Sequence, residues 1–179
     1  GDTLAARGHA AWSIAEIAAY IDKAPDDGVY HLRNGTLARW LEAQGAPDLA
    51  DVARDALRAF PLDARAALEV LLQETGVVEH PVLSVYPPRI DLGAMVAGSE
   101  RTASFRIQQR GRGYLFGALY TDSRWLHLEN DTFAGADTTV LVRADTRDLP
   151  ISPHPVQGVI YLTSPVLVAP VEVPVCLHV

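Results

Sequence analysis

Three potential metal ligands alternate along one short segment of this sequence. His127, Glu129 and Asp131 occupy every second position of WLHLEND. A β-strand points alternate side chains to the same face, and an imidazole with two carboxylates can bind a divalent cation. The same alternation is typical of the polar face of an exposed strand, with Leu126 and Leu128 turned inward. Both interpretations, a metal site and a solvated strand face, are open from the sequence.

A second set of candidate residues surrounds a glycine-rich turn. Arg110 and Arg112 flank the first glycine of GRG, Arg106 precedes the turn on the same predicted strand, and Tyr114 follows it. Guanidinium groups in such a loop can bind an anion or an acidic segment of a partner protein. A solvated hairpin tip has the same composition, so the turn is also explained without a ligand.

The single cysteine has a potential base nearby. Cys176 and His178 would share one face of the last strand, but the sequence shows no acidic or oxyanion-stabilising partner for them, and such a cysteine is usually inert. No G-x-S-x-G elbow, P-loop, dinucleotide-binding fingerprint or H-E-x-x-H motif occurs. We therefore expect a chain that is not an enzyme and that needs no cofactor.

Composition narrows the class of protein. The 179 residues are 49% hydrophobic and 21% charged, so the chain can bury a core. Its formal net charge of −7 argues against nucleic-acid or anionic-membrane binding. One cysteine excludes an intramolecular disulfide framework, and no apolar run has a membrane-spanning length. The sequence shows no secretory signal, so a cytoplasmic location is the default expectation.

The chain divides near residue 80. Residues 1–79 contain 18 Ala, 5 Val and 3 Pro, whereas residues 80–179 contain 8 Ala, 13 Val and 9 Pro. Alanine favours helices, and valine in short proline-bounded runs favours strands. The first part carries a net charge of −6 and the second a net charge of −1. We expect two segregated domains, an α+β arrangement with an acidic helical bundle at 1–79 and a β-sandwich at 80–179.

The first part has the pattern of four short amphipathic helices. Ser13 and Glu16 form a capping-box pattern before the first helix, which we expect to end at Pro25 and the following Asp-Gly pair. Further helices are predicted at 36–44, 47–60 and 63–76, each bounded by Gly, Pro or Asp. Short connections between four such helices predict a four-helix bundle.

The second part alternates with a period of two. Strands are predicted near 83–85, 90–92, 103–107, 114–120, 125–128, 138–144, 157–163 and 166–177. About eight short strands in about 100 residues predict an antiparallel immunoglobulin-like sandwich. In the last strand Pro174 falls in the outward-facing row, which predicts an edge strand because proline cannot donate to a ladder.

Two stretches resemble known families. PVLSVYPPRIDLGAMVAGSERTASFRI, GRGYLFGAL, RWLHL and GVIYLTSPVLVAPVEVPVCLHV are together similar to bacterial immunoglobulin-like sandwiches of the Hydin, BACON and PapD-like kind. This resemblance covers 81–179 and implies a binding or spacer module with no shared catalytic residues. The GTLARWL segment, followed by DLA, resembles small helical modules of large bacterial signalling or chaperone-like proteins.

We therefore expect a non-catalytic protein-protein interaction or accessory module. The single lysine and the initial glycine suggest a piece of a larger bacterial protein, whose other domains are possible partners alongside an unidentified protein. Recognition would use strand addition at 171–177 or the turn at 110–114. The alternative is a carbohydrate- or other ligand-binding sandwich that uses an exposed aromatic ring such as Tyr86, Tyr120 or Trp125. Nucleic-acid binding and membrane insertion are not expected.

Overall fold

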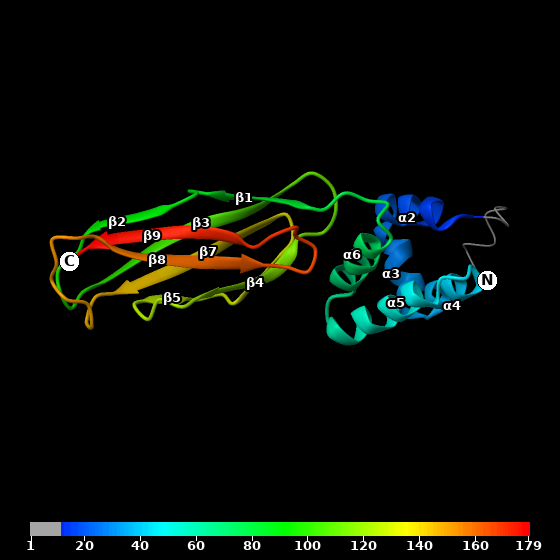
Figure 1. Cartoon of the computed structure of the whole chain (residues 1–179), viewed down its shortest axis with the longest axis horizontal. Helices are drawn as coiled ribbons and strands as arrows, with labels where there is room; N and C mark the ends of the chain where they lie inside the picture. Colours follow the sequence, from blue (N-terminus) through cyan, green and yellow to red (C-terminus); the bar gives the residue numbers. More distant parts are fainter. Residues whose placement is uncertain (1–11) are drawn as a thin grey trace. The chain divides into compact units, whose positions relative to one another are not determined.

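The computed structural model describes residues 12–179, and these form two compact units (Figure 1). The division falls between His80 and Pro81. The first unit is helical and the second consists of two β-sheets.

The described part of the helical unit contains five helices. Their bounds are α2 (Ile14–Lys23), α3 (Pro25–Arg33), α4 (Thr36–Ala43), α5 (Pro47–Ala59) and α6 (Ala64–Glu74). Ser13 caps α2 by accepting a hydrogen bond from the Glu16 amide at 3.1 Å, as its capping box predicts. Apolar side chains from all five helices form one core, with these large members: Ile17, Ile21, Leu32, Leu37, Leu41, Leu68, Leu71 and Leu72.

The prediction of four helices was wrong because it missed α3. Pro25 is the first residue of this helix, where a fixed φ and a missing N–H are tolerated. Asp26 and Asp27 occupy the first turn, where carboxylates favour the helix dipole. Gly28 is buried within the helix, and a Cβ there would contact Ile21 and lie 2.9 Å from a Leu68 methyl carbon. Gly28 therefore allows the helices to pack closely and does not end a helix.

The second unit is a sandwich of two sheets (Figure 1). One sheet has the order β1-β3-β7-β5 and the other β2-β9-β8-β4-β6. Their bounds are β1 (Val82–Tyr86), β2 (Ile90–Ala94), β3 (Glu100–Arg110), β4 (Phe116–Thr121), β5 (Leu126–Leu128), β6 (Thr132–Ala134), β7 (Asp137–Asp145), β8 (Val156–Thr163) and β9 (Val171–His178). The pairs are antiparallel except β2 with β9.

This connectivity is that of an immunoglobulin-like sandwich. With β1, β3, β4, β5, β7, β8 and β9 as strands A to G, the sheets read A-B-E-D and G-F-C, the constant-type arrangement. β2 and β6 extend the second sheet on its two sides. The inward rows of both sheets bury large apolar side chains, among them Phe105, Ile107, Val140, Val142, Ile160, Leu162, Val173 and Val175.

The prediction of an exposed edge at residues 171–177 was wrong for the C-terminal half of the strand, whereas residues 171–174 pair with β8 alone. β9 lies between β8 and β2, and its residues Val175, Cys176 and His178 pair with β2. Pro174 is tolerated because the pairing with β2 begins only at the next residue. The predicted alternation does hold, since Val173, Val175 and Leu177 are buried and each of their neighbours is more exposed. The strand starts at Val171, five residues later than predicted.

Gly28 provides a stability test of the helical unit. Substitution of an open helical glycine by alanine usually stabilises a helix. Here the new methyl group would press on Ile21 and Leu68, so we expect Gly28→Ala to lower the free energy of unfolding by about 1–3 kcal/mol. Urea denaturation followed by helical circular dichroism measures it. In an Ile21→Ala background the additional cost should shrink; a stabilised Gly28→Ala protein would contradict the packing argument.

Candidate binding sites on the sandwich

The four edge strands of the sandwich differ in how well they are protected. β5 and β6 have only three residues each, and β2 is interrupted by a register shift between Asp91 and Ala94. β1 is a regular strand of five residues, VLSVY, with no charged side chain. Short edges, irregular edges and charges on edges all hinder the addition of a further strand. Of these four edge strands, β1 therefore has the weakest protection.

The backbone groups that β1 leaves open can be assigned from its neighbours. The Gln109 amide donates to Ala136 on the β7 side of β3, so residues 106, 108 and 110 turn their backbone groups toward β1. Ser84 pairs with Gln108, whereas Leu83 and Val85 direct their N–H and C=O groups away from β3. Pro81 and Pro87 lie just beyond the two ends of β1, in the same alternating set of positions as Leu83 and Val85. Both lack an N–H.

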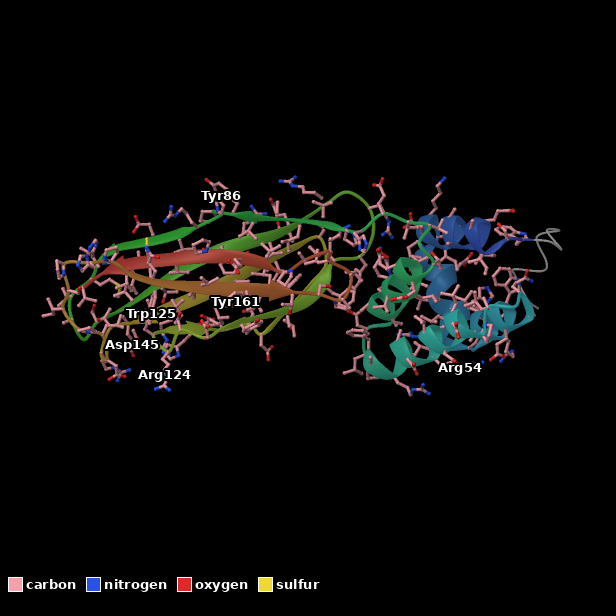
Figure 2. All side chains as sticks on the ribbon, viewed as in Figure 1. Arg54, Tyr86, Arg124, Trp125, Asp145 and Tyr161 are labelled. Atoms are coloured by element: carbon pink, nitrogen blue, oxygen red, sulfur yellow. The ribbon has the colours of Figure 1, made fainter. Side chains whose placement is uncertain are left out.

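The side chains of β1 alternate between core and solvent. Leu83 and Val85 pack against the core, while Val82 and Tyr86 are 56% and 72% exposed. Val82, Ser84 and Tyr86 therefore present an uncharged outer row beside the open edge. Figure 2 shows the Tyr86 side chain on the surface of the sandwich.

Two of the predicted binding arginines lie next to this outer row. Arg106 is opposite Tyr86 and Arg110 is opposite Val82. Arg106 forms an ion pair with Asp137, and this hydrogen-bonded pair raises the pKa of Arg106 and lowers that of Asp137. Arg110 donates to the Ser84 hydroxyl at 3.3 Å and to Gln108 Oε1 at 3.2 Å. Among the described residues it has no carboxylate partner, so its charge is uncompensated at the β1 edge.

The other predicted binding residues lie in different surroundings. Arg112 is in the turn after β3, and Tyr114 stacks on Phe116 with ring centroids 5.8 Å apart. Trp125 follows the C-terminal end of β4, whereas the arginine-rich turn precedes its N-terminal end. β3 spans the sandwich from Glu100 to Arg110, and Glu100 contacts Arg147 near Trp125 at 3.4 Å. Trp125 and the arginine-rich turn are therefore at opposite ends of a strand about 33 Å long.

The three predicted metal ligands do not assemble. His127 lies exposed on β5, but β5 ends at Leu128, so Glu129 and Asp131 lie outside the strand that was to align them. Across residues 12–179 no group of three or more His, Cys, Asp or Glu side chains could hold a metal ion. Of the three residues, only His127 lies on the exposed face of a strand, as the alternative interpretation requires.

Cys176 and His178 do not form a reactive pair in this structure. His178 Nε2 lies 3.3 Å from the Pro153 carbonyl oxygen, and the Cys176 thiol is half-buried and outside any disulfide.

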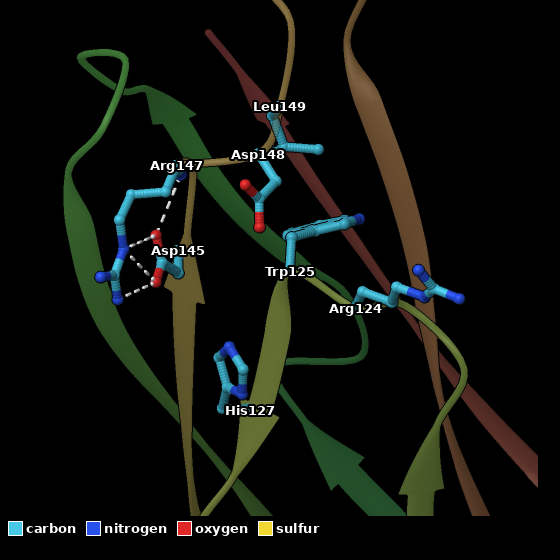
Figure 3. A pocket seen from close by; sticks show the side chains of 7 residues that line it. All are labelled: Arg124, Trp125, His127, Asp145, Arg147, Asp148 and Leu149. Carbon is cyan, nitrogen blue, oxygen red and sulfur yellow. Dashed lines mark hydrogen bonds and ion pairs between the residues drawn. The ribbon is translucent and has the colours of Figure 1, made fainter.

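Trp125 and His127 instead share a cleft that the sequence did not predict (Figure 3). Its volume is about 660 Å³, and its lining comes from the β4–β5 connection and the segment after β7: Arg124, Trp125, His127, Asp145, Arg147, Asp148 and Leu149. Gly158 of β8 makes room for the indole, because a Cβ there would lie 2.8 Å from Trp125 Cζ2. Trp125 and Leu149 supply apolar surface, whereas Arg124, His127 and Asp148 are polar and exposed.

A fully buried threonine fixes one wall of this cleft. The Thr146 hydroxyl donates to the Val96 carbonyl at 2.9 Å and accepts from the Ser99 amide at 3.0 Å. The Asp145 amide donates to the Trp125 carbonyl at 2.9 Å. These bonds join the segment after β7 to two other segments, so the wall is preorganised.

Two of the cleft residues, Asp145 and Arg147, are paired with each other in an ion-pair network. Arg147 Nη2 lies 2.7 Å from Asp145 Oδ2, and the Arg147 amide donates to Asp145 Oδ1 at 2.9 Å. These hydrogen bonds lower the pKa of Asp145 to about 2. Glu100 joins the network by pairing with Arg143 at 2.8 Å. Arg124, His127 and Asp148 are the polar groups left for a ligand, and no lining residue is a serine, threonine or cysteine nucleophile.

Comparisons with known proteins show a likeness of fold only. No family model matches the chain, and no curated protein sequence matches it. A Porphyromonas gingivalis protein of unknown function is 14% identical with a TM-score of 0.46, over 56% of this chain and 48% of that one. The CsuC-CsuE chaperone-tip adhesion subunit complex of Acinetobacter baumannii is 7% identical with a TM-score of 0.42, over 54% and 56%. A Bacteroides ovatus GH5 xyloglucanase is 10% identical with a TM-score of 0.42, over 55% and 19%.

This chain thus spans less than two thirds of the length of each of these proteins. Within residues 12–179, no helix combines the length and apolar character that a membrane span requires.

The Asp145 carboxyl group gives a test of the ion-pair network. Its ordinary pKa is 3.8 and its pKa in the folded protein is about 2, so its ionisation favours folding at pH values above the ordinary pKa. This contribution is lost as the pH falls through about 2. We expect a carboxyl-detected NMR titration to show a midpoint near 2 that rises toward 3.8 in Arg147→Gln. A wild-type midpoint at the ordinary value would contradict the pairing.

Proposed function

We propose that this chain is a non-catalytic protein-interaction module that binds an extended segment of a partner by adding it as a strand to β1. The observation that carries the proposal is the open edge of β1, where Leu83 and Val85 direct unpaired backbone groups outward from an uncharged, regular strand. Strand addition satisfies such groups with main-chain hydrogen bonds, and neighbouring side chains select the sequence. Other domains of the same polypeptide could supply the segment as well as a separate protein.

The side chains around β1 favour an acidic segment. An added strand would place its outer side chains beside Val82, Ser84 and Tyr86, and Arg110 already reaches Ser84. Its guanidinium has no carboxylate partner among the described residues, so a glutamate on the incoming strand would supply one. β5 and β6 have shorter edges than β1.

A synthetic peptide that alternates valine with glutamate tests this proposal. We expect it to bind more tightly than the matching valine-lysine peptide, with an affinity that falls as salt increases. Arg110→Ala should weaken binding by about 1.5- to fivefold, the usual range for one exposed charge pair. Arg124→Ala removes the same charge from the far end of the sandwich and is the matched control. Equal binding of the two peptides, or an unchanged Arg110→Ala affinity, would contradict the acidic preference.

Amide hydrogen exchange locates the bound strand. In the free protein the Leu83 and Val85 amides should exchange faster than the Ser84 amide, which pairs with β3. Peptide binding should slow exchange at Leu83 and Val85 while Ser84 changes little. Protection elsewhere on the sandwich, with none at these two amides, would reject β1 as the site.

A second candidate function rests on the Trp125 cleft. An indole beside the exposed Arg124 and Asp148 side chains suits a small polar ligand such as a carbohydrate, with ring stacking and hydrogen bonds to hydroxyl groups. The other exposed aromatic candidates are elsewhere, since Tyr86 ends β1 and Tyr120 stacks on Tyr161 with centroids 5.1 Å apart.

A glycan array decides between these two functions. Ligand binding at the cleft predicts a specific glycan signal that Trp125→Ala abolishes and Tyr120→Ala leaves intact. Tyr120→Ala is a suitable control because it removes an exposed ring from the same unit outside the cleft. An array without a specific signal, together with binding of the acidic peptide at β1, would leave the interaction module as the function.

A further inference from the structure

Two adjoining grooves on the helical unit are lined by arginine and aromatic side chains. The larger, about 520 Å³, lies along α3 and α4 and is lined by these residues: Tyr30, His31, Asn34, Thr36, Arg39, Trp40 and Ala43. The smaller, about 400 Å³, is lined by Asp26, Val29, Tyr30, Arg33 and Asn34. Tyr30 and Asn34 belong to both, so the two grooves adjoin across the exposed Tyr30 ring.

The two arginines of these grooves are available for a ligand. Arg33 and Arg39 are both exposed, and among the described residues neither forms an ion pair. Other arginines of the unit are committed, because Arg54 pairs with Glu42 at 2.6 Å and Arg58 pairs with Asp55. The unit has a net charge of −6, but these unpaired guanidinium groups make the surface of the grooves locally positive.

Local contacts hold the groove residues in place. The Tyr30 ring packs edge-on against buried His31, with centroids 5.1 Å apart. Asn34 Oδ1 accepts a hydrogen bond from the Thr36 amide at 2.9 Å, in an Asx turn that leads into α4. Gly35 has a φ of 82°, and a Cβ there would lie 3.1 Å from Arg39 Nη1. The Arg39 guanidinium therefore lies over the turn between the helices, next to Asn34.

We infer that these grooves bind an acidic peptide segment in which carboxylates flank an apolar residue. The apolar side chain would contact Val29 and the Tyr30 ring, and the carboxylates would pair with Arg33 and Arg39. Asp26 lines the smaller groove, which favours a carboxylate on the Arg39 side. The acidic surroundings repel a long polyanion, so a short peptide fits better than a nucleic acid.

This site is separate from the β1 edge, because every residue that forms it belongs to the helical unit. Evidence against strand addition at β1 would therefore not count against this site, and the reverse also holds. It would give the chain a second point of contact with a partner protein.

A fluorescent peptide of sequence EELEE, measured by anisotropy with the whole chain, tests the inference. We expect it to bind more tightly than KKLKK, and the double variant Arg33→Ala/Arg39→Ala should weaken binding by about tenfold or more. Tyr30→Ser should also weaken binding. Arg58→Ala is the matched control, since it removes an exposed arginine of the same unit outside the grooves.

Two further measurements keep the result specific. Arg110→Ala should leave EELEE affinity unchanged, which separates this site from the β1 edge. Binding should shift the NMR amide signals of Tyr30 and Trp40. Equal affinity for EELEE and KKLKK, an unaffected double variant, or tighter binding of a single-stranded oligonucleotide than of EELEE would overturn the inference.

Discussion

The sandwich depends on how its sheet edges satisfy their backbone hydrogen bonds. After β1 the chain leaves the first sheet, and β2 joins the second sheet alongside β9. This crossing gives β9 two neighbours along its C-terminal half, so the strand with the most regular valine alternation becomes interior. It also leaves β1 with a single neighbour, β3. The same crossing therefore closes one edge and opens another, and the proposed site follows from it.

Much of the element order could be predicted because the side-chain period changes from 3.6 to 2 near residue 80. Local signals fail where the deciding contact is distant in sequence. Pro25 and Gly28 read as a helix end, but Gly28 is required where α3 packs against Leu68, forty residues later. β6, with only three residues, is too short to show a period.

The candidate sites show the same limit. Arg106 and Arg110 were recognisable as a basic pair, yet their position beside an open edge depends on the pairing of β3 with β1. The Trp125 cleft takes Asp148 and Leu149 from the segment after β7, about 20 residues further along the chain. No spacing rule links these residues to Trp125, since only the pairing of β5 with β7 brings the two segments together. Residue types were therefore readable from the sequence, but their neighbours were not.

The two proposed peptide sites share arginines without a carboxylate partner among the described residues, although the net charge of the chain is −7. Several arginines lie in ion pairs, as in Arg143 with Glu100 and Arg54 with Glu42. Arg110, Arg33 and Arg39 do not, and each lies beside an uncharged or aromatic surface. An acidic protein can therefore select acidic segments locally while its overall field discourages long polyanions.

The short β1 edge also limits the affinity of one contact. Leu83 and Val85 offer two donors and two acceptors, and a backbone hydrogen bond contributes about 0.5–1.5 kcal/mol net. Four such bonds, offset by the cost of ordering the peptide, support weak binding at most. Specificity must then come from Arg110 and Tyr86, and high affinity from a second point of contact. Linking two weak contacts in one partner raises the effective concentration of the second, so an acidic site on the helical unit would complement a short edge on the sandwich.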